Sequence, residues 1–165
     1  MGSLYLWIKF IHVVAGFTFI MGHGVSVALA FRIQKEKDLS RVQAMFDLSG
    51  SMWHVYMRSW LVLMVAGVAN GFMRHWWSSG WIWISLVLML VITVWMFRLG
   101  MKTYHPLRKA FGLAYQVGKD EMPPELPLSE EERVKLLEAT DPKLMIWVGY
   151  GGFLLILWLM IFKPF

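Results

Sequence analysis

Four long apolar stretches constrain this chain of 165 residues more than any other feature of its sequence. Residues 81–97 and 144–162 contain no Asp, Glu, Lys or Arg, and each is long enough to cross a bilayer as a single helix. Residues 4–31 form a third apolar stretch, and the fourth, residues 51–74, carries Arg58 inside it. Because a helix satisfies its own backbone hydrogen bonds in lipid, the sequence predicts an all-α bundle of four transmembrane helices.

The predicted bundle is one membrane domain that covers the whole chain. Its helices extend over residues 4–31, 51–74, 80–99 and 144–163, and a cytoplasmic loop of residues 100–143 carries short helices between the third and the fourth. Apolar residues at helical spacing predict a short helix on the membrane surface over residues 102–117. Ser129 and Glu132 form a capping-box pattern that predicts a second one. The loop is either a tether that docks on the bundle or a surface that binds a partner.

The amino-acid composition excludes several classes of protein. Only 16% of the residues are charged and 58% are hydrophobic, whereas a soluble domain carries about 25% charged residues. Such an apolar chain is neither an ordinary soluble domain nor a disordered one. Cysteine is absent, which excludes disulfides, thiolate metal sites, iron–sulfur clusters and covalently attached c-type haem.

The net charge of +5 does not indicate a nucleic-acid partner. Of the 16 basic and 11 acidic side chains, twelve basic and all eleven acidic ones lie in residues 32–50 and 98–143, where they nearly cancel. The excess comes from four cations within or beside the apolar stretches: Lys9, Arg58, Arg74 and Lys163. We therefore expect a lipid bilayer, and no nucleic acid, around this chain.

The basic residues also predict the orientation. The connections that hold twelve Lys or Arg residues lie on one side of the membrane, and the other side has three at most. The positive-inside rule places these connections in the cytoplasm and both termini outside, in a multi-pass protein of the inner (cytoplasmic) membrane. The first stretch lacks a basic n-region and is too long for a signal peptide, so we expect an uncleaved helix.

Histidines are the strongest candidates for chemistry, because ionisable groups are costly inside a membrane. His12 and His23 lie eleven residues apart on the first helix, three turns plus about 20°, and so share one face. On the second helix His75 is expected at the height of His12, whereas the height of His54 matches His23 less well. Paired imidazoles on neighbouring helices are the axial ligands that a b-type haem requires, so these four histidines are candidate iron ligands.

One haem fits the spacing better than two. The two histidines of the first helix are separated by about 16 Å along its axis, and those of the second by about 31 Å. An anionic cofactor also needs cations near an interface. Lys9 lies one turn before His12, and Arg58 lies one turn after His54. These two basic residues are candidates to hold haem propionates or a quinone headgroup.

Plainer interpretations apply to the same features. Each histidine can hydrogen-bond within the bundle, Arg58 can extend to the inner headgroups, and glycines at positions 67 and 71 are typical of close helix packing. The thirteen methionines are compatible with copper handling through soft thioethers, although they form no Met-x-x-Met cluster.

The two ends of the chain resemble a superfamily of small four-helix membrane proteins. Residues 6–13, Leu-Trp-Ile-Lys-Phe-Ile-His-Val, are similar to its Trp-x-Lys-x-x-His opening, and residues 162–165, Phe-Lys-Pro-Phe, to its Lys-Pro ending. The group includes HemJ-type protoporphyrinogen oxidases, CopD-like copper resistance proteins and an uncharacterised branch. The resemblance to the HemJ branch implies haem b binding by His12. A lysine early in the third helix and an Asn-Glu-x-Pro element before the fourth are lacking, so the chain is most similar to the uncharacterised branch.

We therefore expect an integral membrane b-type haem protein that takes part in membrane electron transfer or tetrapyrrole redox chemistry, as an oxidoreductase or an electron-transfer subunit. The expected partners are a quinone or a redox protein, within a larger membrane complex or a homo-oligomer. Two alternatives stay open. One is a cofactor-free structural or assembly subunit, and the other is a copper transport or resistance protein.

Overall fold

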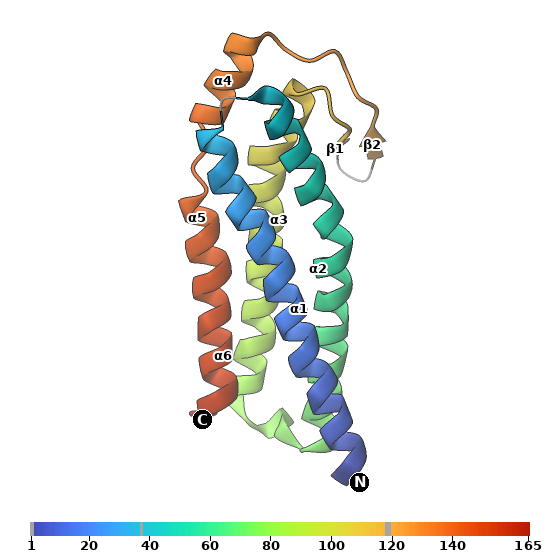
Figure 1. Cartoon of the computed structure of the whole chain (residues 1–165). Helices are drawn as coiled ribbons and strands as arrows, with labels where there is room; N and C mark the ends of the chain where they lie inside the picture. Colours follow the sequence, from blue (N-terminus) through green and yellow to red (C-terminus); the bar gives the residue numbers. More distant parts are fainter. Residues whose placement is uncertain (1, 37, 118–119) are drawn as a thin grey trace.

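The computed structural model describes residues 2–36, 38–117 and 120–165, and they form an upright bundle of four long helices (Figure 1). The elements in chain order are α1 (Gly2–Lys35), α2 (Leu39–Met73), the 3-10 turn η1 (Trp76–Ser78), α3 (Gly80–Ala110), β1 (Tyr115–Val117), β2 (Asp120–Met122), α4 (Glu130–Glu138), α5 (Lys143–Ile146), the π-helical segment η2 (Trp147–Gly151) and α6 (Gly152–Phe162). The last three form one crossing. Each of the four crossings is long and apolar enough to span a membrane, so the chain is a multi-pass membrane protein, as predicted.

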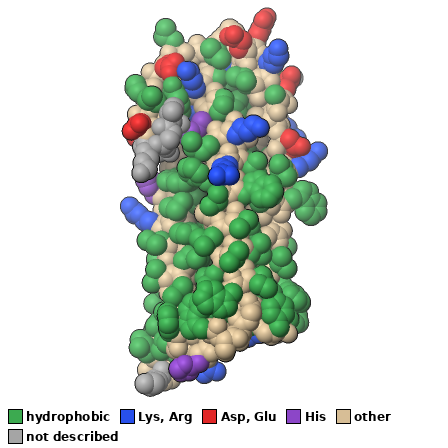
Figure 2. Space-filling view, turned by 180° about the vertical axis from the view of Figure 1, so that it is seen from behind, with side chains coloured by type: hydrophobic (Ala, Val, Ile, Leu, Met, Phe, Trp, Pro, Cys, Tyr) green, Lys and Arg blue, Asp and Glu red, His purple; other side chains and the backbone are tan. Residues whose placement is uncertain are grey.

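The two ends of the bundle differ in chemistry. Both termini lie at one end, which we call the terminal end (Figure 1). The opposite end carries α4, the short strands and most charged side chains, and we call it the polar end. Figure 2 shows an apolar surface below a cap of mixed acidic and basic side chains. This division matches the charge distribution along the sequence.

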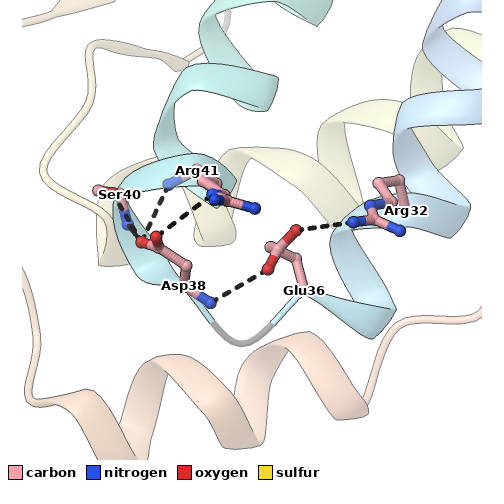
Figure 3. A network of polar contacts seen from close by, with 5 residues as sticks. All are labelled: Arg32, Glu36, Asp38, Ser40 and Arg41. Atoms are coloured by element: carbon pink, nitrogen blue, oxygen red, sulfur yellow. Dashed lines mark hydrogen bonds and ion pairs between the residues drawn. The ribbon is translucent and has the colours of Figure 1, made fainter.

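The second helix begins at Leu39, twelve residues before the predicted start at residue 51. Asp38 caps it, because its carboxylate accepts hydrogen bonds from the backbone N–H groups of Ser40 at 2.9 Å and Arg41 at 3.4 Å (Figure 3). The first turns of this helix bury Val42 and Phe46 while their polar neighbours face outward. The charged residues of this segment had indicated a connection, whereas its buried face makes it an amphipathic helix.

Three of the crossings extend beyond the bilayer. At 1.5 Å per residue, α1, α2 and α3 are each about 50 Å long, against a hydrocarbon core of about 30 Å. Their extensions meet α4 at the polar end and enclose a second apolar core, separate from the one inside the membrane. Its buried residues are Ile33, Val42, Phe46, Leu107, Ala110, Phe111, Leu113 and Leu137.

The connection between α3 and α4 differs from the prediction in its first half. The surface helix predicted over residues 102–117 is wrong, because α3 continues to Ala110 and a short antiparallel hairpin of β1 and β2 follows. The predicted capping box is confirmed: the Ser129 hydroxyl accepts from the Glu132 N–H, and the Glu132 carboxylate accepts from the Ser129 N–H. The segment docks on the bundle, since the Leu128 N–H donates to the Ala110 carbonyl at 3.0 Å.

Candidate functional site

The crossings pack as two pairs, α1 with α2 and α3 with α6. Glycines allow both close approaches: a Cβ at Gly22 would lie 3.3 Å from the Cβ of Tyr56, and a Cβ at Gly152 would overlap the side chain of Ile92. Residues of both pairs line a cavity of about 980 Å³ in the half of the bundle nearer the polar end. That volume lies in the range of cofactor and ligand sites.

Apolar and aromatic side chains form most of the cavity wall. Three of the five histidines also line it, namely His23, His54 and His105. His12 and His75 do not. The structure therefore keeps the pair of His23 and His54, adds His105, and leaves out the pair of His12 and His75 that sequence spacing favoured.

His23 is held from three sides. Its ring stacks on Phe19 at a centroid distance of 6.4 Å and an interplanar angle of 4°, and lies 5.6 Å from the ring of Tyr150. Its Nε2 is buried and has no hydrogen-bond partner among the described residues. A Cβ at Gly149 would lie 2.7 Å from this nitrogen, so only glycine leaves room beside it. A buried unpaired imidazole nitrogen next to a cradle of this kind is the feature that most requires a functional explanation.

A π-helical segment supplies the opposite wall of the His23 site. η2 is a short π-helix inside an otherwise α-helical crossing, and such segments are rare and frequent at functional sites. It presents two consecutive residues, Gly149 and Tyr150, to the His23 ring. A Cβ at Gly24 would lie 2.9 Å from the Tyr150 hydroxyl, so a second glycine accommodates this tyrosine. The sequence showed the glycines but gave no sign of the π-helix.

His54 lies on α2 opposite the level of His23. Contacts on both sides of the pair establish this register: Ser49 and Ser26 hydroxyls lie 3.5 Å apart, and Tyr56 contacts Gly22. The two histidines are thus better matched in height than expected. His54 has an exposed side chain, whereas His23 is largely enclosed.

His12 joins α1 to α2. Its Nδ1 lies 2.9 Å from the carbonyl oxygen of Leu63, to which it donates, so the neutral ring carries its lone pair on Nε2. The expected match in height with His75 is wrong. Leu63 precedes His75 by twelve residues, about 18 Å along the helix. His75 is exposed just beyond α2, at the terminal end.

Gly67→Ala is expected to destabilise the protein by about 1–3 kcal/mol, the usual cost of overpacking. A Cβ there would lie 3.0 Å from Cε1 and 3.3 Å from Nδ1 of His12, so the ring must withdraw from the Leu63 carbonyl. Gly16→Ala is the matched control on α1, because its Cβ would make an ordinary 3.6 Å contact with Leu63. Thermal unfolding in detergent, followed by circular dichroism, compares the two. Equal melting temperatures would contradict the role of His12 as a link between helices.

The candidate cations lie outside the cavity. Lys9 is exposed near the terminal end, and Arg58 lines a shallow groove of about 270 Å³ on the bundle surface. The cations on the cavity wall are instead Arg98 and Arg108, which sequence reasoning did not select. Arg108 is already engaged, since it donates to the carbonyls of Phe46 at 3.0 Å and Ala114 at 2.7 Å, whereas Arg98 is exposed.

A second residue of the cavity wall also carries a buried polar atom without a partner. Trp60 lines the cavity, and its buried Nε1–H has no hydrogen-bond acceptor within the part of the chain that the structure describes. Two buried polar atoms without partners are unusual on one cavity wall, because most such atoms are satisfied.

Among the residues that the structure describes, no three His, Asp or Glu side chains lie close enough together to hold a metal ion by themselves. Haem iron needs only one or two imidazoles, because the porphyrin supplies the other ligands. The fit of the chain to haem therefore depends on His23 and its neighbours. In comparisons with known proteins, no family model, curated protein or solved structure matches this chain.

Proposed function

We propose that this protein binds one b-type haem in the cavity between the two helix pairs and takes part in membrane electron transfer or tetrapyrrole redox chemistry. The observation that carries the proposal is the buried, unpaired Nε2 of His23 beside Gly149. His23 is one of the residues that line the apolar cavity of about 980 Å³, and a neutral imidazole nitrogen without a hydrogen-bond partner has the chemistry of an iron ligand.

Each surrounding residue has a defined part in this proposal. His23 would hold the haem iron, and the rings of Phe19 and Tyr150 fix the orientation of its imidazole. His54, on the same level of α2, is the candidate second ligand. The apolar walls exclude water, and a bound haem would supply one-electron redox chemistry at this place.

The propionates require cations at the polar end of the cavity. Arg98 is exposed on the cavity wall and suits this role, whereas Arg108 is occupied by backbone carbonyls. This assignment replaces Lys9 and Arg58 as the propionate partners. His12 becomes a link between α1 and α2 that keeps the ligand helices in register.

The setting of the protein forms part of the proposal. The polar end faces the cytoplasm and both termini lie outside, in the inner membrane, because twelve of the 16 basic residues belong to residues 32–50 and 98–143, the two connections on one side of the membrane. A quinone or a redox protein exchanges electrons with the haem. The resemblance of the chain ends to the HemJ branch implies His12 as the haem ligand, so this proposal differs from it in assigning His23.

The test is the absorption spectrum of protein purified gently from haem-sufficient cells. We expect a haem band in the wild-type protein and a 10- to 100-fold lower haem affinity in Gly149→Ala, whose Cβ displaces the ligand imidazole. Gly151→Ala is the matched control in the same π-helix, because a Cβ there meets nothing within 4 Å. Wild-type protein without a haem band, or equal haem loss in both variants, would refute the proposal.

A further inference from the structure

Three basic side chains from distant parts of the chain meet at the terminal end. Lys9 lies on α1, Arg74 caps the end of α2 and Lys163 follows α6. The Arg74 guanidinium lies over the ring of Tyr5, 5.1 Å from its centroid, and Tyr5 is one helical turn from Lys9. Burial lowers the pKa of Lys163, and the positive charges of Lys9 and Arg74 lower it further. Arg74 lies two residues before Trp76, whose ring contacts Lys163, so the three basic residues gather at one end of the bundle.

The fold positions Lys163 in this group. Its backbone has a φ of 45°, in the left-handed region, which ends α6 and turns the chain across the end of the bundle. Its Nζ lies 4.0 Å from the ring centroid of Trp76 and 5.4 Å from that of Trp81. The Trp81 N–H donates to the Phe165 carbonyl at 3.4 Å, and the Phe165 ring covers Gly80. The position of Lys163 is thus fixed by the rings of Trp76 and Trp81 and by the contacts of the neighbouring Phe165.

No acidic side chain balances these cations. All eleven Asp and Glu residues lie between residues 36 and 141, at or near the polar end. On the face in Figure 2, the acidic side chains lie toward that end, whereas the ionisable side chains seen at the other end are basic or histidine. Three cations gathered at one end, with no acidic side chain among them, attract an anion.

We propose that these three cations, which we call the terminal cation site, bind the phosphodiester of an anionic membrane lipid. The site lies just beyond the apolar ends of α2, α3 and α6, which is the height of lipid headgroups, among tryptophans typical of that interface. Phe72 and Phe162 adjoin it and are 65% and 66% exposed, so acyl chains find apolar contact there. The inference is independent of the haem proposal.

The test is a titration of purified protein in neutral detergent with short-chain phosphatidylglycerol, with bound lipid counted by native mass spectrometry. The triple variant Lys9→Gln/Arg74→Gln/Lys163→Gln is expected to bind about a hundredfold more weakly, roughly five-fold for each cation lost. Binding by the wild-type protein is expected to weaken at high salt, because the ions screen this charge attraction.

The control triple variant, Lys35→Gln/Lys102→Gln/Lys135→Gln, removes three exposed charges from the polar end and is expected to bind like the wild type. Equal weakening in both triple variants overturns the proposal. The proposal is also overturned if phosphatidylcholine binds as tightly as phosphatidylglycerol, because the site would then not select an anionic lipid. It is likewise overturned if inorganic phosphate binds as tightly, because that would assign the site to a free anion.

If the triple variant does not fold, as judged by loss of helicity, single variants test the same proposal. Lys9→Gln replaces an exposed side chain and is expected to weaken phosphatidylglycerol binding about five-fold, while Lys163→Arg retains the charge and the binding. Unchanged binding in a folded Lys9→Gln protein contradicts the proposal.

Discussion

His23→Ala is expected to abolish the haem band of the purified protein. The variant removes the buried Nε2 on which the proposed axial bond depends, and no other histidine is enclosed at that level of the cavity among the described residues. Without His23 the proposed haem would keep only the exposed His54, Arg98 and the apolar wall, so most of it is expected to dissociate during purification. The measurement is the absorption spectrum together with the haem-to-protein ratio.

Two further variants separate ligation from structure. His75→Ala changes an exposed histidine at the terminal end and is expected to retain the full band. His12→Ala is expected to retain the band and to lower the melting temperature, because it loses the hydrogen bond to Leu63. Free imidazole is expected to restore the band of His23→Ala, since the vacated space admits it. If His12→Ala abolishes the band and His23→Ala does not, the cavity is not the haem site.

Leu107→Ala is expected to destabilise the polar end by about 2–5 kcal/mol, the usual cost of truncating a buried leucine. Leu107 is 1% exposed and packs in the core with Phe46 and Phe111, outside the bilayer. A cavity there cannot be filled by lipid. The expected result is faster hydrogen exchange and faster proteolysis of the segment from α3 to α4.

Leu126→Ala is the matched control for this variant. Leu126 lies in the same connection and is 92% exposed, so its truncation is expected to leave exchange and proteolysis unchanged. The haem band is expected to survive in both variants, because the polar core is separate from the core inside the membrane. Equal protection of the polar end in Leu107→Ala and in the wild type would contradict a cooperative core there.

The fold was predictable where hydrophobicity is continuous. The apolar stretches of residues 81–97 and 144–162 have few alternatives to a membrane crossing, and α3 and α5 to α6 cover them. The predicted helix bounds were wrong where α2 and α3 extend beyond the apolar stretches. Residues 39–51 and 100–110 mix apolar with charged side chains, and the buried contacts of Val42 and Leu107 reveal their helical faces.

The sequence indicated that histidines form the candidate site, but it did not indicate which residues lie opposite each histidine. The cost of burying ionisable groups already singled out His12 and His23. Their partners depend on the register between helices, which shifts with the length of each connection. Because α2 begins at Leu39, the first connection is short, and this places His54 opposite His23 and Leu63 beside His12.

The sequence by itself determined four apolar crossings, a charged end and an opposite end with cations but no acidic side chain, since these follow from composition along the chain. Only the tertiary structure decided which side chains meet: the orphaned Nε2 of His23 against Gly149, and Lys163 among the aromatic rings near Lys9 and Arg74. The physical reason is that hydrophobic partition into lipid is a property of each segment. Contacts between segments depend on register, on close approach at glycines and on a π-helical turn, and short-range sequence patterns do not encode them.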